Sequence, residues 1–304
     1  MGSLASEPRP VLTLTSSPPP QIDSSRYRVI AAFCPKEAGA DTDVFNCIQS
    51  YDPSNNTWNH VSFIPDLLEN HVLKGFSMVS LRGSIYIIGG MLWNKKKPRN
   101  STESDVGDVK VSALVFRYDV LIDRWSKCAP LGTPRENLRG GRFRRERRFG
   151  PEHADISPQR CSAEVFDARA EKWDLEAGMW QLDVPPNQIV AVGGKLFSSG
   201  DCLIPWKGHI EVYDGKLNIW DEVDGSQCNP PISTMERLYL TMAPIGTQLY
   251  FFAGYKKAEE PSKTLSMAYT FDTSATTDAW KSFEPMEEDD EKELCSHCCV
   301  VQLW

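Results

Sequence analysis

Apolar residues in this chain fall in short runs that come in pairs. In the clearest pair, Phe76 to Leu81 and Ser84 to Ile88 are separated by a polar turn. The segments NQIVAVGGKLFSSGD (187–201) and YLTMAPIGTQLYFFAG (239–254) repeat the arrangement. Runs of this length, rich in β-branched and aromatic residues and bounded by glycine, predict two antiparallel strands joined by a tight turn. The hydrophobic pattern therefore predicts an all-β chain.

A second pattern recurs along the chain: an aromatic residue, an aspartate, a short polar stretch and a tryptophan. Its five copies are YDPSNNTW (51–58), YDVLIDRW (118–125), FDARAEKW (166–173), YDGKLNIW (213–220) and FDTSATTDAW (271–280). An aspartate side chain can bond the backbone of a turn, so each copy predicts a third strand, a turn and a fourth strand. In the second copy these strands are Leu114 to Tyr118 and Trp125 to Cys128. A four-stranded sheet with two apolar faces needs neighbours, so the units are expected to stack radially.

The repeat-defining residues are expected to have structural roles. The aromatic residue and the tryptophan can fill the space between sheets, and glycine at the end of a second strand allows close backbone packing or positive φ. The residues are Tyr51, Asp52, Trp58, Gly89, Gly90, Tyr118, Asp119, Trp125, Phe166, Asp167, Trp173, Tyr213, Asp214, Trp220, Gly254, Phe271, Asp272 and Trp280.

These marks resemble the kelch repeat, and the chain resembles the plant F-box/kelch-repeat family, a branch of the galactose-oxidase-like propellers. The resemblance covers about residues 26–304 and implies a kelch-type β-propeller with five recognisable four-stranded blades. Kelch rings more usually have six blades, and a sixth copy is not visible. RYRVIAAF (26–33) resembles a second strand without a first, and CSHCCVVQLW (295–304) a first strand without a second. We therefore expect N-terminal strands to close the ring by pairing with the C-terminal strand.

Two segments are expected to lie outside regular blades. Residues 1–25 are rich in Pro and Ser and predict a disordered tail. PRENLRGGRFRRERRFGPEH (134–153) stands where the third unit should supply two apolar strands, and seven arginines there would bury unpaired charge. We therefore expect 134–160 to be degenerate or disordered. Three interpretations stay open: a polyanion-binding segment, a nuclear localisation signal, or the remnant of a lost blade left by a variant transcript or gene-model error, which we favour.

Composition narrows the function classes. A net charge of −8 and a pI near 5.3 argue against a general nucleic-acid-binding protein. We find no signal peptide and no apolar run long enough for a membrane helix. The nine cysteines are therefore expected to be free thiols in the cytoplasm, the nucleus or both. The KKKPR cluster (Lys95 to Arg99) could serve as a nuclear signal, although we favour a solvated loop.

No catalytic, cofactor-binding or metal-binding residue is predicted. The cluster Cys295, His297, Cys298 and Cys299 suggests a metal site, but strand alternation places Cys298 on the opposite face from the other three residues. No second Cys/His pair has ligand spacing. Asp289, Glu293 and His297 match the iron-binding motif of nitrile-specifier kelch proteins only with the acids reversed. The acidic run EPMEEDDEKE (284–293) is expected to be a solvated loop, with docking to a basic partner as the alternative.

The resemblance implies a non-enzymatic protein–protein interaction module, which selects substrates for a ubiquitin ligase or acts as a scaffold. Loops from one face of such a propeller would form the recognition face, where exposed Trp, Tyr and Arg are typical anchors. The candidate partner-binding residues are Trp93, Arg135, Trp206, Lys207, Arg237 and Tyr255. Their mixture of rings and cations predicts an acidic protein partner for a monomeric chain.

Two further expectations follow. We find no F-box before the propeller, so we do not expect binding to a Skp-type adaptor. The alternative function is a small-molecule enzyme or a metal-dependent specifier protein that uses the central channel.

Overall fold

The computed structural model describes residues 23–36, 44–95, 110–131, 149–150, 163–167, 172–176, 188–199, 206, 208–225, 235–256, 263–275, 277–288 and 291–303. Apart from η1 (Ser24–Arg26), a short 3₁₀ helix, the regular structure in these ranges is β. No helix in these ranges is long and apolar enough to cross a membrane. Most of the predicted tail and of the arginine-rich stretch lies outside the described residues. The all-β prediction is confirmed.

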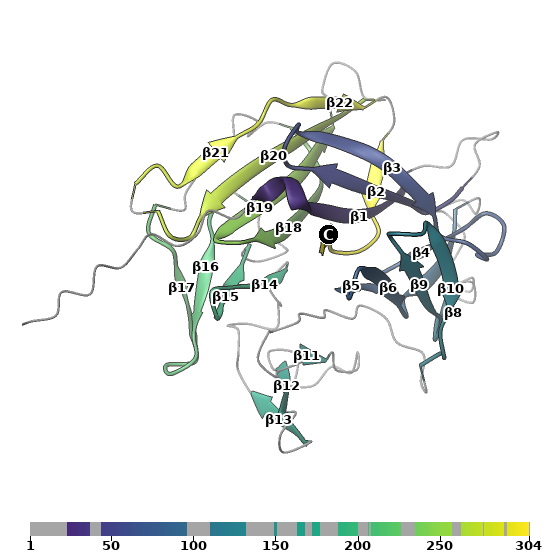
Figure 1. The fold of residues 1–304 in the computed structure, drawn as a ribbon, viewed down its shortest axis with the longest axis horizontal. Coiled ribbons are helices and arrows are strands. Elements are labelled where there is room, and N and C mark those ends of the chain that lie inside the picture. The colour runs from purple at the N-terminus through teal and green to yellow at the C-terminus, as the bar shows by residue number, and fades with distance from the viewer. Residues whose placement is uncertain are drawn as a thin grey trace, which may run out of the picture.

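Five of the six antiparallel sheets formed by the described residues follow one another along the chain and lie around a common centre (Figure 1). Sheet 1 contains β1 (Tyr27–Pro35), β2 (Cys47–Asp52), β3 (Thr57–Phe63), β23 (Lys292–Leu294) and β24 (Cys299–Gln302). Sheet 2 contains β5 (Ser77–Leu81), β6 (Ser84–Ile88), β9 (Val115–Asp119) and β10 (Arg124–Lys127). Sheet 3 contains β11 (Phe149–Gly150), β12 (Ala163–Asp167) and β13 (Lys172–Glu176). Sheet 4 contains β14 (Ile189–Val192), β15 (Lys195–Ser198), β16 (Glu211–Asp214) and β17 (Ile219–Glu222). Sheet 5 contains β18 (Arg237–Ile245), β19 (Gln248–Lys256), β20 (Thr264–Asp272), β21 (Trp280–Ser282) and β22 (Met286–Glu288).

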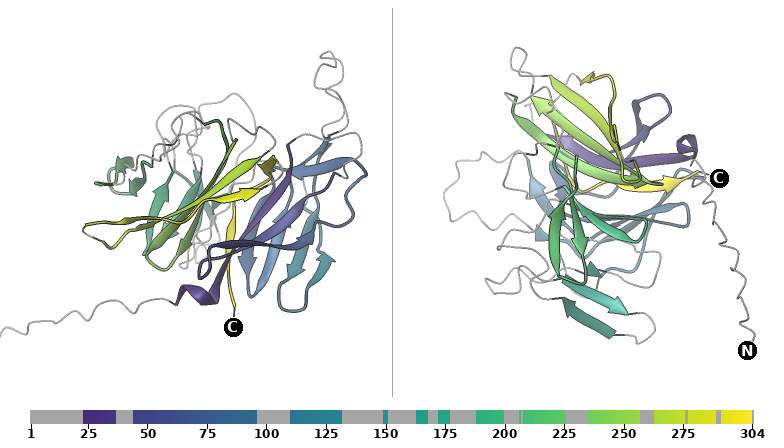
Figure 2. Two further views of the ribbon diagram at one scale, coloured as in Figure 1. Left: turned by 90° about the horizontal axis from the view of Figure 1, so that it is seen from above. Right: turned by 90° about the vertical axis from the view of Figure 1, so that its left-hand side faces the viewer.

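The first strand of the chain pairs with the last ones. Tyr27 faces Gln302 in the β1–β24 ladder, and Phe33 faces Leu294 in the β1–β23 ladder, both antiparallel. The C-terminal strand therefore runs beside the N-terminal strand (Figure 2). Pairing between the two ends of the chain agrees with the prediction, and the several four-stranded sheets are consistent with a β-propeller.

Alternation along β1 explains why the sheets pack side by side. Val29, Ala31 and Phe33 belong to the apolar core shared with sheet 5. Ile30, Ala32 and Cys34 belong to the core shared with sheet 2. Successive side chains of a strand point to opposite faces, so an uninterrupted apolar strand covers two neighbours at once. A third core joins sheets 4 and 5.

Two parts of the fold differ from the sequence-based expectation. A small sheet of β4 (His71–Lys74), β7 (Met91–Asn94) and β8 (Lys110–Val111) was not predicted. It lies beyond glycines Gly75, Gly89 and Gly90, all of which have positive φ, so these glycines redirect the strands and do not end them. The acidic run is also not a solvated loop, because β22 and β23 form within it and Lys292 is buried.

Candidate functional site

The aromatic–Asp–Trp repeat builds a tight turn at the outer edge of each sheet. The aromatic residue and the tryptophan face each other across the third and fourth strands, as in Tyr51–Trp58 and Tyr118–Trp125. Their ring centroids are 5.3 Å and 4.9 Å apart. Asp52 accepts a hydrogen bond from the Ser54 backbone N–H at 2.9 Å. The same register pairs Phe166 with Trp173, Tyr213 with Trp220 and Phe271 with Trp280, and Asp119, Asp214 and Asp272 accept corresponding backbone bonds.

A further residue of this turn was missed from the sequence. Asn56, Asp123, Asn218 and Asp278 each stand two positions before the tryptophan and have φ of 53°, 49°, 55° and 49°. Asn and Asp tolerate the left-handed region better than other side chains. Where the repeat begins with tyrosine, the phenol also donates to this side chain, at 3.0 Å to Asn56 and 2.6 Å to Asn218. The recurring Asn or Asp two residues before Trp is the signal that identifies it.

Three of the repeat tryptophans contact the preceding sheet. Trp58 of sheet 1 contacts Phe252 of sheet 5, with centroids 5.2 Å apart. The Trp125 indole of sheet 2 donates to Ser62 of sheet 1 at 2.9 Å. Trp280 of sheet 5 lies 6.1 Å from Trp206, which follows β15 of sheet 4. These repeat residues therefore hold neighbouring sheets together.

The predicted partner-binding residues do not form one exposed surface. Trp93 is 39% exposed, but Trp206 and Tyr255 are only 6% and 4% exposed. The Trp206 ring stacks on Phe251 and its indole donates to the His209 carbonyl. The prediction that Trp206 and Tyr255 lie on an exposed binding face is therefore wrong, because both rings are buried. Arg237 is half-buried, and burial lowers its pKa. Arg135 and Lys207 lie outside the described residues.

Four lysines lie close together at one end of the sheets, near the C-terminal ends of β1, β7 and β19. We call Lys36, Lys74, Lys95 and Lys256 the lysine cluster. Lys36 follows β1, Lys95 follows β7 and Lys256 ends β19, so equivalent strand ends of three sheets contribute to it. Lys74 ends β4 and lies 5.9 Å from the centroid of the exposed Trp93 ring. A lysine near the end of three of these strand segments, in CPK, WNK and GYK, is a sequence signal that we did not use.

Two carboxylates of the acidic run, Glu291 and Glu293, lie on the lysine cluster. We call them the glutamate pair. Glu291 is 3.1 Å from the Lys36 ammonium and 2.5 Å from that of Lys256. Glu293 forms an ion pair with Lys74 and lies 3.5 Å from Lys95. The Lys95 ammonium also donates to the Lys36 carbonyl at 2.8 Å, so the groups form one continuous network.

The network sets the charge state of its members. The Lys256 hydrogen bond, followed by that of Lys36, lowers the pKa of Glu291. Burial acts to lower the pKa of Lys36 and Lys74, but hydrogen bonds and charge from the glutamate pair outweigh it, so both pKa values are raised. Burial dominates for Lys95, whose pKa is lowered. Charged ammonium groups of this kind can hold carboxylates, and raised lysine pKa values do not suit a general base.

Lys292 anchors the segment that carries the glutamate pair. Its side chain points away from the pair, because neighbouring residues of a strand alternate. The ammonium lies 4.1 Å from the Phe33 ring centroid, within reach of Trp58 and Tyr239, and donates to Gln49 at 3.0 Å. An ion pair with Glu288 completes its surroundings. Lys292 therefore holds the segment on one face of the strand, while the two carboxylates contact the lysine cluster on the opposite face.

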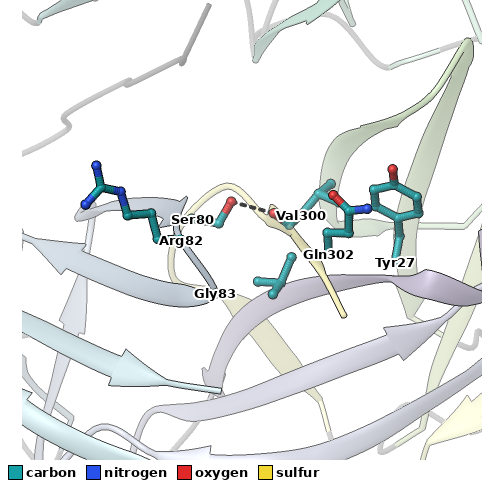
Figure 3. Close-up of a pocket in the computed structure, with 7 residues that line it drawn as sticks. Tyr27, Ser80, Arg82, Gly83, Val300 and Gln302 are labelled. Atoms are coloured by element: carbon teal, nitrogen blue, oxygen red, sulfur yellow. Dashed lines mark hydrogen bonds between the residues drawn. The ribbon is translucent and has the colours of Figure 1, made fainter. Parts of the chain in front are cut away.

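The described residues offer little for small-molecule chemistry. A hollow of about 280 Å³ lies between the β5–β6 turn and β24, at the opposite end of β1 from the lysine cluster, where Ser80 donates to the Val300 carbonyl (Figure 3). A second, of about 290 Å³, is lined in part by Phe45, Leu68 and Glu69. Both volumes lie near the lower limit of roughly 300 Å³ for small-molecule sites.

Of the cysteines near the C-terminus, Cys295 and Cys298 are buried and Cys299 is half-buried. Cys295 and Cys299 lie in or against the core of sheets 1 and 2, whereas Cys298 lies in the core of sheets 1 and 5. Burial raises the pKa of all three thiols, that of Cys298 to about 12. Among the described residues, no three His, Cys, Asp or Glu side chains come together as metal ligands.

Comparison with known proteins gives distant likenesses. No known family model matches the chain. It is 25% identical over 187 residues to an Arabidopsis thaliana protein described as an F-box/kelch-repeat protein, covering 58% of this chain and 47% of that one. It is 27% identical over 94 residues to alpha-scruin of Limulus polyphemus, covering 31% of this chain and 9% of that one. The chain thus spans about half the length of the Arabidopsis relative. Together the likenesses support a kelch-repeat relationship and suggest a protein-interaction module.

Proposed function

We propose that this chain is a non-enzymatic protein-interaction module, built as a kelch-type propeller of five recognisable blades. The chain ends close the ring through the pairing of β1 with β23 and β24. An acidic protein partner binds at the lysine cluster, beside Trp93. The observation that carries this proposal is the convergence of lysines from equivalent strand ends of three sheets next to an exposed tryptophan. Aromatic and cationic side chains together are typical of binding anchors.

A role in substrate selection for a ubiquitin ligase rests on the Arabidopsis likeness alone. A pull-down with a Skp-type adaptor tests only whether this chain joins such a ligase directly, and we expect no direct binding. The six described cysteines are free thiols, including the neighbouring Cys34 and Cys295. We propose the cytoplasm, the nucleus or both as the place of action, where a reducing environment would keep such thiols free.

Affinity capture with quantitative mass spectrometry tests the partner-binding face. The double variant Lys36→Gln/Lys256→Gln should lose most of the partner protein, because the charge that attracts its carboxylates is reduced. Lys195→Gln/Lys216→Gln is the matched control, since both lysines are exposed and lie in or beside turns at the opposite end of the strands. If the two double variants capture the same proteins in the same amounts as the unaltered chain, the lysine cluster is not the binding face.

A further inference from the structure

The glutamate pair shows which ligand shape the lysine cluster accepts. Glu291 and Glu293 stand two residues apart at the start of β23, and Lys292 between them points to the opposite side. Each carboxylate meets two lysines from different strands: Glu291 meets Lys36 and Lys256, and Glu293 meets Lys74 and Lys95. In an extended segment, side chains two residues apart share a face. The spacing of the lysines therefore matches an extended segment with carboxylates at alternate positions.

Within the part of the chain that the structure describes, the lysine cluster carries more positive charge than the neighbouring carboxylates balance. Four ammonium groups meet the two carboxylates of the glutamate pair, and one further described acid, Glu236, lies 3.5 Å from Lys36 with a side chain that is 64% exposed. Lys95 is the least compensated member, because the nearest carboxylate among the described residues is 3.5 Å from its ammonium. The lysine side chains remain between 12% and 32% exposed, so a second protein can reach them.

We propose that the lysine cluster is the docking site for an extended acidic segment of a partner, with carboxylates two residues apart, and that the glutamate pair competes with it in cis. This inference rests on the proposed function and deepens it, because it names the form of the partner and a control on its binding. The competition takes place between side chains. β23 stays in place, since its backbone pairs with β1 and Lys292 is held among the rings of Phe33, Trp58 and Tyr239.

Fluorescence anisotropy with two labelled peptides of equal charge tests the proposal. One peptide carries two glutamates separated by one serine, and the other carries them separated by four serines. The unaltered full-length chain should bind the first peptide more tightly. Glu291→Gln/Glu293→Gln should bind it about fivefold more tightly still, the factor expected when two partly exposed ion pairs no longer compete. Glu69→Gln/Glu284→Gln, which removes two exposed acids elsewhere, should leave the affinity unchanged.

A footprint on the unaltered chain keeps the test independent of variant folding. The first peptide should protect Lys36, Lys74, Lys95 and Lys256 from acetylation, read by peptide mass spectrometry, and leave Lys195 and Lys216 fully reactive. Equal affinity of the unaltered and Glu291→Gln/Glu293→Gln chains, equal binding of both peptides, or no lysine protection overturns this inference. The proposed function has a separate test, because it fails only if partner capture is insensitive to Lys36 and Lys256.

Discussion

At the scale of single residues, close backbone approach decides which positions must be glycine. Gly90 has φ of 100°, and a Cβ there would lie 2.9 Å from the Lys74 carbonyl oxygen. Gly254 occupies the equivalent place in sheet 5 with an ordinary φ, but a Cβ there would lie 2.1 Å from a ring carbon of Tyr239. Glycine is therefore required at Gly90 because φ is positive there, and at Gly254 because a Cβ would clash with the Tyr239 ring.

Gly254→Ala should destabilise the protein by about 1–3 kcal/mol, the usual cost of overpacking a core. The Tyr239 ring must move to admit the methyl group, and its hydroxyl is hydrogen-bonded to Ser266 at 2.8 Å, so it moves at a cost. Urea unfolding measures the change. Gly215→Ala is the control, because its Cβ would meet only ordinary contact at 3.6 Å, and it should have little effect. Equal stability of the two variants would contradict the steric explanation.

At the scale of elements, two buried amide side chains join strands of neighbouring sheets. Asn46, beside β2, accepts from the Leu73 N–H at 2.7 Å and donates to the Leu73 carbonyl at 2.8 Å. Gln188, beside β14, accepts from the Met242 N–H of β18 at 2.6 Å and donates to the Met242 carbonyl at 2.7 Å. Each amide thus satisfies both backbone groups of one residue in the adjoining sheet. Buried backbone groups without partners are costly, so these amides stabilise the junctions between sheets.

Gln188→Ala should lower the free energy of unfolding by about 1–3 kcal/mol, because it leaves the buried Met242 N–H without a side-chain acceptor and the Met242 carbonyl with only the Cys298 thiol, 3.3 Å away. Chemical unfolding measures the loss, and amide hydrogen exchange should show faster exchange at the Met242 N–H. Gln248→Ala is the matched control, since Gln248 is half-buried at the start of β19 and its side chain has no hydrogen bond among the described residues. A loss no larger than that of the control would refute the junction role.

At the scale of the whole molecule, the two ends of the chain meet in one sheet and the lysine cluster lies over this junction. The glutamate pair comes from the C-terminal part of the chain, whereas Lys36 and Lys74 come from the N-terminal part. The same network that forms the candidate binding face therefore also helps to hold the chain ends together. Its effect on stability should depend on pH.

Acid should remove the contribution of Glu291. Its folded-state pKa is lowered from the ordinary 4.5, so its stabilisation is present above that value and is lost as pH falls through the lower folded pKa. Glu291→Gln should therefore be less stable than the unaltered chain by about 0.5–1 kcal/mol at neutral pH. The two should become equally stable below the folded pKa. Urea midpoints across the acid range measure this, with Glu284→Gln as the exposed control, and a difference that persists in acid would contradict the assignment.

Strand positions were predictable because they depend on local pattern. Ser84–Ile88 appears as a strand with the bounds read from the sequence, since alternation and turn residues act over a few positions. The pairing of the N-terminal strand with the C-terminal strand was also predicted, because an unpaired strand at each end of a repeat array has one obvious partner. The burial of Trp206 and Tyr255 was not, because a ring beside a loop packs inward or outward according to neighbours distant in sequence.

By itself, the sequence determined the repeating strand–turn–strand unit, its turn aspartates and the order of the sheets, since each depends on interactions within about one repeat. Only the tertiary structure decided that Glu291 and Glu293 meet lysines more than 30 residues away in the chain, and that Lys292 is buried among aromatic rings. The sequence pattern of a charge run does not show which residues it pairs with. Ion pairs of this kind form only when the fold brings residues that are distant in sequence within a few ångströms of each other.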